Sequence, residues 1–212
     1  MNKINRALRV LLLFVIALSV CACGPSTSRP VASKPPPAPK NLELNVTSQG
    51  LRVNWDPVPG ATRYTVFWGY EREDYKYLRD FAQPSATLAG LQKGRLYSVA
   101  VTCWSSNGES DYSAGQLIVY DDDPRHSSRY LSKGNELLNK GSLAEAQSYL
   151  SAAIRLDPNN VQAYQSRGLL FEKLDRPDLA KRDYAAATRI LKTKPLTRMG
   201  VGFSQDRTTR QD

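Results

Sequence analysis

SSRYLSKGNELLNKGSLAEAQSYLSAAIRLDPNN, residues 127–160, is followed directly by VQAYQSRGLLFEKLDRPDLAKRDYAAATRILKTK, residues 161–194. The two stretches have the same length, and small and large residues recur in them at matching positions. Such a period is typical of stacked helix pairs, in which small residues let two helices approach closely. The matching positions pair Tyr130 with Tyr164, Gly134 with Gly168, Leu137 with Phe171, Ala146 with Ala180, Leu150 with Tyr184, and Ala153 with Ala187.

Local signals indicate where the helices end. Ser142 followed by Glu145 forms a capping-box pattern at the start of a helix. Pro158 interrupts one helix and Asn160 caps the next, while Pro177 suits the first turn of another. Together with the period, these signals predict four helices, near 127–140, 143–156, 161–174 and 177–191.

The repeated residues resemble the tetratricopeptide repeat (TPR), whose aromatic, glycine, alanine and proline positions recur here in order. The sequence departs from that pattern at Lys133 and Arg167, where leucine is frequent, and at Lys192, where a second proline would stand. The resemblance implies that the first helix of each unit lines a concave groove for a peptide or helix of a protein partner. By position, the groove would be lined by Leu131, Asn135, Leu138, Gln162, Gln165, Leu169 and Glu172.

Residues 40–121 have a different period, because apolar residues alternate with polar ones in short runs such as Leu51, Val53 and Trp55. Alternation of this kind, broken by turn residues, predicts an antiparallel β-sandwich. The stretch resembles the fibronectin type III domain in its tryptophan and tyrosine positions. The characteristic residues are Trp55, Tyr64, and Leu91 six positions before Tyr97. The resemblance implies that the Tyr97 hydroxyl bonds back to the backbone near the turn.

The N-terminus has basic residues ahead of an apolar run at residues 10–20, which is the plan of an export signal. Val20-Cys21-Ala22-Cys23 resembles the bacterial lipobox, which implies removal of residues 1–22 and lipid attachment to Cys23. Gly24 after that cysteine implies sorting to an outer membrane where the cell has one. The alternative is an ordinary secretory signal with incidental cysteines.

Three connecting segments complete the predicted organisation. Residues 23–39 are rich in proline and serine and predict an extended, unpacked tether of at most ~50 Å. Residues 122–126 form a linker between the sandwich and the repeats. Residues 195–212 predict a flexible tail. The predicted fold is therefore multidomain, with an all-β sandwich followed by an all-α repeat made of units 127–160 and 161–194.

The formal net charge of +9 is concentrated in the helical repeat. Residues 40–123 carry 8 basic and 11 acidic residues, a net charge of −3, whereas residues 124–194 carry 13 basic and 7 acidic residues, a net charge of +6. Solvated helix faces explain most of this excess, and an acidic partner or an anionic membrane surface is the alternative. The distribution does not predict nucleic-acid binding.

No pattern of catalytic or metal-ligating residues stands out. The one histidine, His126, falls in the predicted linker, where solvent exposure is expected. The cysteines lack the spacing of a zinc site, and Cys103 is expected in the core of the sandwich. Asp121 and Asp122 are interpreted as solubilising residues at the end of a domain. The sequence predicts no enzyme, no metal and no cofactor.

These features predict an envelope lipoprotein that recruits a protein partner through the groove of the repeats, with the sandwich as spacer or docking module. It would reach the membrane through the N-terminal lipid. One alternative is a pilotin-like assembly factor for a secretion or pilus system. Another is a surface protein that binds carbohydrate through exposed aromatic residues of the sandwich, namely Phe67, Tyr70, Tyr75 and Tyr77.

Overall fold

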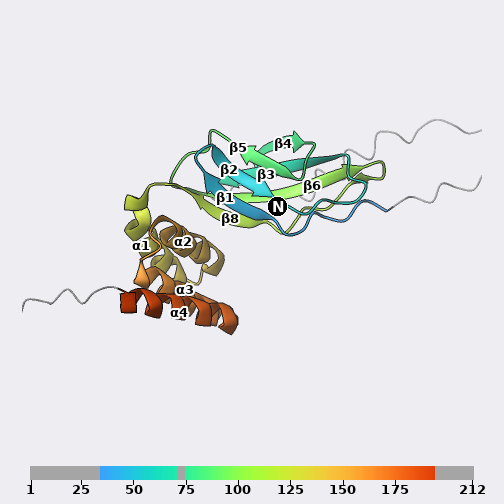
Figure 1. The fold of residues 1–212 in the computed structure, drawn as a ribbon. Helices are drawn as coiled ribbons and strands as arrows, with labels where there is room; N and C mark the ends of the chain where they lie inside the picture. The colour runs from blue at the N-terminus through green and yellow to red at the C-terminus, as the bar shows by residue number, and fades with distance from the viewer. Residues whose placement is uncertain (1–33, 71–74, 194–212) are drawn as a thin grey trace, which may run out of the picture. The chain divides into compact units, whose positions relative to one another are not determined.

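The computed structural model describes residues 34–70 and 75–193. The predicted signal peptide, Cys23, the first part of the tether and the predicted tail lie outside the described residues. In the described part, two layers of β-strands are followed by four helices (Figure 1). This arrangement confirms the predicted order of an all-β sandwich and an all-α repeat.

The β-sandwich is built from one sheet of three strands and one of five, all paired antiparallel. The first sheet has the order β1-β2-β5; the second has the order β4-β3-β6-β7, and β8 pairs with β6. Connections cross between the sheets, as in Greek-key sandwiches. The strands are β1 (Glu43–Thr47), β2 (Gly50–Asn54), β3 (Arg63–Tyr70), β4 (Tyr77–Phe81), β5 (Ser85–Leu88), β6 (Arg95–Ser105), β7 (Gly108–Glu109) and β8 (Gln116–Tyr120).

The alternating apolar residues meet between the two sheets. The Trp55 and Tyr64 rings pack edge to face with centroids 5.3 Å apart. At the turn before β6, the backbone N–H of Gln92 donates a hydrogen bond of 2.9 Å to the Tyr97 hydroxyl. The predicted bond between this tyrosine and the turn is therefore confirmed. Cys103 is fully buried and unpaired, as expected of a core residue.

The end of the proline-rich segment is packed rather than free. Pro39 is buried, and the Cys103 thiol donates to the Pro37 carbonyl oxygen at 3.4 Å. The prediction of an unpacked tether is thus wrong for these last residues. The contact between Pro37 and Cys103 of β6 explains the difference, because it holds this part of the segment against the sandwich.

The repeat consists of two antiparallel helix pairs, α1·α2 and α3·α4, with α2 and α3 in contact. Asn160 caps α3, since its side chain accepts the N–H of Ala163 at 3.1 Å. Ser142 is the N-cap residue of α2, which confirms the predicted start of the helix, but its side chain makes no capping hydrogen bond. The helices are α1 (Ser127–Asn139), α2 (Leu143–Leu156), α3 (Val161–Lys173) and α4 (Pro177–Thr193), close to the predicted bounds.

Two glycines bring the helices of each pair together. A Cβ atom added to Gly134 would lie 2.7 Å from the Leu150 side chain, and one added to Gly168 would lie 2.5 Å from the Tyr184 ring. Both distances are far below van der Waals contact, so only glycine fits without a shift of the partner. The same repeat position therefore meets the same partner position in both units, which accounts for the period seen in the sequence.

None of the helices in the described residues is long and apolar enough to cross a membrane.

Candidate functional site

The predicted groove corresponds to one face of α1 and α3, two helices that contact each other. Gln162, Gln165, Leu169 and Glu172 are all exposed and lie on one side of α3, at the spacing of successive helical turns. Leu169 is 46% exposed, which is unusual for a large apolar residue. Asn135 of α1 is half-buried. We call these five residues the α1/α3 face.

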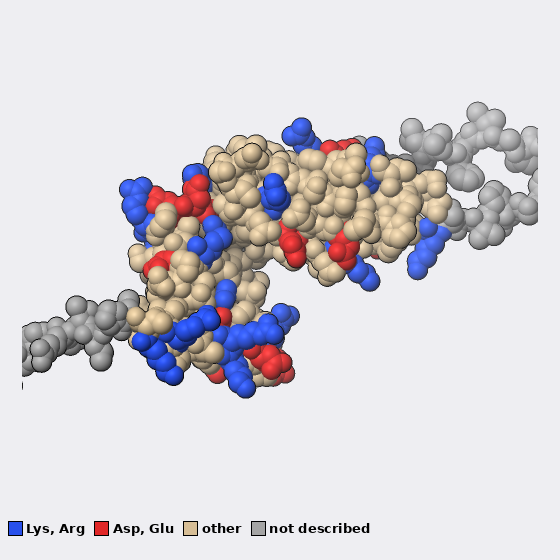
Figure 2. All heavy atoms as spheres, in the orientation of Figure 1, with Lys and Arg blue, Asp and Glu red and all other residues tan. Residues whose placement is uncertain are grey.

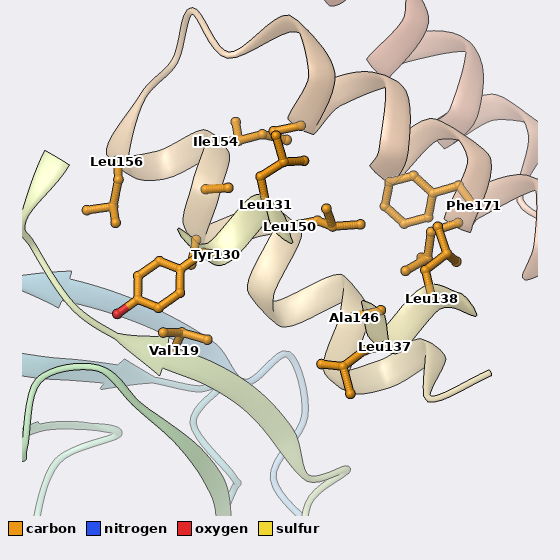
Figure 3. Packing of buried hydrophobic residues seen from close by; sticks show 14 of the residues in the cluster. Val119, Tyr130, Leu131, Leu137, Leu138, Ala146, Leu150, Ile154, Leu156 and Phe171 are labelled. Carbon is orange, nitrogen blue, oxygen red and sulfur yellow. The ribbon is translucent and has the colours of Figure 1, made fainter. Parts of the chain in front are cut away.

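Two of the predicted groove residues belong to the core. Leu131 is 9% exposed and Leu138 is 5% exposed, and both pack in the apolar cluster of the repeat. Figure 3 shows Leu138 lying beside Phe171 of α3, which covers it. Stacking of the second unit on the first thus buries these leucines, and the surface open to a partner is smaller and more polar than expected.

A buried ion pair fixes α3, which carries most of the α1/α3 face. The Arg167 guanidinium makes two bonds to Asp183 of α4, from Nε to Oδ2 at 2.7 Å and from Nη2 to Oδ1 at 2.8 Å. Its Nη1 donates to the Ser151 hydroxyl of α2 at 3.1 Å. Three helices are therefore joined through one side chain, which holds α3 at a defined angle.

Glu172 of the α1/α3 face lies close to Tyr184 of α4. Burial and the neighbouring Glu172 carboxylate raise the pKa of Tyr184. The α1/α3 face therefore combines two amides, one half-buried amide, one apolar side chain and one carboxylate. Such a set can make hydrogen bonds to a backbone and one apolar contact, and it contains no nucleophile with a paired base.

A second polar cluster joins the sandwich to the repeat; we call Asp121, His126, Tyr130 and Arg155 the junction cluster. The Tyr130 hydroxyl of α1 donates to Asp121 Oδ2, and His126 Nδ1 lies 2.8 Å from the same oxygen. Arg155 of α2 donates to the main-chain oxygens of Asp121 and, at 2.9 Å, of Val119 in β8. Figure 3 shows Tyr130 extending from the helix toward Val119.

The junction cluster overturns two expectations from the sequence. Asp121, interpreted as a solubilising residue, is 1% exposed. His126, expected to be exposed in a linker, is half-buried in a short 3₁₀ helix, Pro124–His126, that leads directly into α1. The reason is that α2 packs against β8, so the connection between the modules becomes part of an interface.

Hydrogen bonding decides the charge state of Asp121. Burial alone would raise the pKa of this carboxyl, but bonds from Tyr130, from the N–H of Asp123 and from His126 outweigh it, and the pKa lies below its usual value. The pKa of Tyr130 is raised, first by burial and then by its bond to Asp121. The junction therefore holds a charged carboxylate and a neutral phenol at neutral pH.

The aromatic residues named for a carbohydrate surface do not form one platform. Tyr70 packs on Tyr97 in the core, with ring centroids 5.9 Å apart. Tyr77 stacks on Trp68 at 5.8 Å. The remaining two gather around a residue that the sequence did not single out, because Tyr112 lies 5.0 Å from Phe67 and 5.6 Å from Tyr75.

Within residues 34–70 and 75–193, no group of three or more His, Cys, Asp or Glu residues could hold a metal ion.

Two family models match the chain. Fibronectin type III domain matches residues 37–116, and tetratricopeptide repeat matches residues 127–160. Together with the two-layered sandwich and the paired helices, they define a chain with a fibronectin type III domain followed by a TPR-like helical region. Both are typically non-catalytic interaction modules, which suggests a protein-interaction or scaffold role.

Individual proteins are similar to part of the chain. The tail tube protein gp17.1* of Bacillus phage SPP1 is 36% identical over 78 residues, which are 37% of this chain and 28% of the phage protein. The chain therefore spans less than a third of that relative. The fibronectin type III domain of the human collagen alpha-1(XX) chain is 27% identical, with a TM-score of 0.36, over 45% of this chain and 93% of that domain. An Fn3-like protein from Clostridium thermocellum is 23% identical, with a TM-score of 0.34, over 40% and 93%.

Proposed function

We propose that the protein is a non-enzymatic lipoprotein of the bacterial cell envelope, anchored through Cys23, that holds a segment of a partner protein on the α1/α3 face. The sandwich and the repeat act as one arm, because the junction cluster ties the first two helices to β8. The outer membrane is the proposed location.

The observation that carries the binding proposal is the exposed Leu169 among amides on α3. Leu169 is 46% exposed, whereas Leu170 beside it is fully buried. An extended or helical segment laid along α3 could cover Leu169 and accept or donate hydrogen bonds at Gln162 and Gln165. Glu172 at the end of this row favours a segment with a basic residue there.

The rigid mounting of this face supports the same function. The three hydrogen bonds of Arg167 to Asp183 and Ser151 fix α3 before any partner arrives. A surface that is already ordered loses less conformational entropy on binding. Nothing comparable supports the carbohydrate alternative, because Phe67, Tyr75 and Tyr112 pack on one another and leave mainly the Tyr112 ring open.

The anchor is tested by replacing each of the two neighbouring cysteines. Cys23→Ala should abolish incorporation of labelled palmitate and release the protein from membranes, whereas Cys21→Ala, the matched control, should leave both unchanged. The reason is that the lipobox resemblance requires a small residue before the modified cysteine, and Ala22 meets it while Val20 does not. Retained label in Cys23→Ala would overturn the anchor assignment.

A further inference from the structure

We propose that the outer face of α4 is a docking surface for an anionic phospholipid bilayer, separate from the α1/α3 face. The face is defined by Lys181, Arg182, Arg189 and Lys192. Arg182 and Arg189 are seven residues apart and Lys181 and Lys192 eleven apart, so at 3.6 residues per turn all four point to one side. Figure 2 shows lysine and arginine atoms gathered over the α3 and α4 region.

These four cations are exposed and, in the described part of the chain, make no ion pair or hydrogen bond from their side chains. Two lysines of the first helix pair behave differently. Lys133 and Lys140 both pair with Glu136, at 3.0 and 2.5 Å. A stripe of uncompensated charge raises the free energy of the isolated protein slightly, and an anionic surface removes that cost.

The shape of the stripe favours a flat partner. The residues between the cations on this side are small, Ala185 and Thr188, so the four charges lie over a surface without bulky obstacles. Leu191, next to Lys192, is 56% exposed. A helix with a basic face and an exposed leucine at its edge is the pattern of an interfacial helix, whose cations meet lipid phosphates while the leucine enters the headgroup region.

The acidic side chains of α4 offset the stripe only at its N-terminal end. Asp183 is buried in its pair with Arg167 on the opposite side of α4. Asp178 lies in the first turn, at the N-terminal end of the stripe, and leaves the segment from Lys181 onward without an acid on that side. An acidic protein would need a row of carboxylates at matching spacing, whereas a bilayer presents phosphates at every position, so the bilayer is the occupant that we propose.

Vesicle binding tests the proposal with the chain from Gly24 to Asp212, which lacks Cys23 and retains every described residue. The protein should sediment with vesicles of phosphatidylglycerol and phosphatidylcholine, and far less with phosphatidylcholine alone. Arg182→Gln with Arg189→Gln should weaken the partition coefficient about 10- to 30-fold. A second pair, Lys181→Gln with Lys192→Gln, should have a similar effect, and higher salt should weaken binding of the parent.

Lys133→Gln with Lys140→Gln is the control, because it removes the same charge from α1, where both lysines are already paired. This control should change the partition coefficient less than about twofold. Equal loss in the control and stripe variants, or equal binding to neutral and anionic vesicles, would overturn the proposal. So would stripe-dependent binding to an acidic protein without binding to vesicles. Because no lipid anchor is present, the outcome is independent of the Cys23 assignment.

Discussion

Replacing Asp183 with alanine should lower the free energy of unfolding of the helical repeat by about 3 kcal/mol. The change leaves the Arg167 guanidinium, whose side chain is only 21% exposed, without the carboxylate that is bonded to it twice. Because little water reaches the guanidinium, hydration cannot compensate for the lost carboxylate. Chemical denaturation followed by circular dichroism at neutral pH measures the loss.

A double variant separates the lost partner from the lost side chain. Arg167→Leu together with Asp183→Ala removes both charges and should recover most of the stability lost in Asp183→Ala, because no unpaired ion remains. Lys181→Ala, which removes an exposed and unpaired charge from the same helix, should leave stability nearly unchanged. Equal stability of Asp183→Ala and Lys181→Ala would contradict the role given to the ion pair.

Asp121→Ala should have an effect of similar size, about 3 kcal/mol, at the junction between the modules. The substitution removes the acceptor of the Tyr130 hydroxyl, of the His126 ring and of the Asp123 N–H, which lies 3.0 Å away. The repeat should then lose its fixed position on β8, and proteases should cleave near residues 122–126 more readily. Denaturation and limited proteolysis measure the two effects.

The neighbouring Asp122→Ala is the matched control for Asp121→Ala, because Asp122 is exposed and should tolerate the change. The effect of Asp121→Ala should also depend on pH. The pKa of Asp121 is lower in the folded protein than its usual value, so the carboxylate contributes stability above about pH 4 and loses it as the pH falls through the folded pKa. A difference between the parent and Asp121→Ala that stays constant from pH 7 to acid would contradict this account.

The helix bounds could be predicted closely because the residues that set them are close in sequence and recur in both repeat units. Gly134 and Gly168 mark the close approach in each unit, and Asn160 and the prolines mark helix ends. The sandwich could be predicted for a similar reason. The alternation of apolar and polar residues indicates which strand faces are buried, and the spacing of Leu91 and Tyr97 indicates a turn. Ser142 shows the limit, because the residues of a capping box were present without the bond that it usually makes.

Contacts between modules could not be read from such patterns. Asp121 and His126 look like an exposed linker because nothing near them in sequence says that α2 will pack on β8. Arg155, whose partners are main-chain oxygens more than thirty residues away, carries no sequence signal of that role.

The ion pair of Arg167 left a trace in the sequence. Arg167 stands where leucine is frequent in the family. Asp183 occupies the repeat position that Tyr149 occupies in the first unit. Burial of Leu131 and Leu138 could not be foreseen in this way, because it depends on how tightly the second unit stacks on the first.

Binding of a partner segment to the α1/α3 face can be measured by site-specific photo-crosslinking in cells, with a photoreactive residue placed at Gln165 or Leu169. Exposed positions outside the α1/α3 face, Ser48 and Asp111 in the sandwich, serve as controls. Gln165 and Leu169 should each give one adduct of defined mass, and both adducts should map to the same segment of a single envelope protein. Absence of an adduct at both positions, or the same adducts at Ser48 and Asp111, would contradict partner binding at the α1/α3 face.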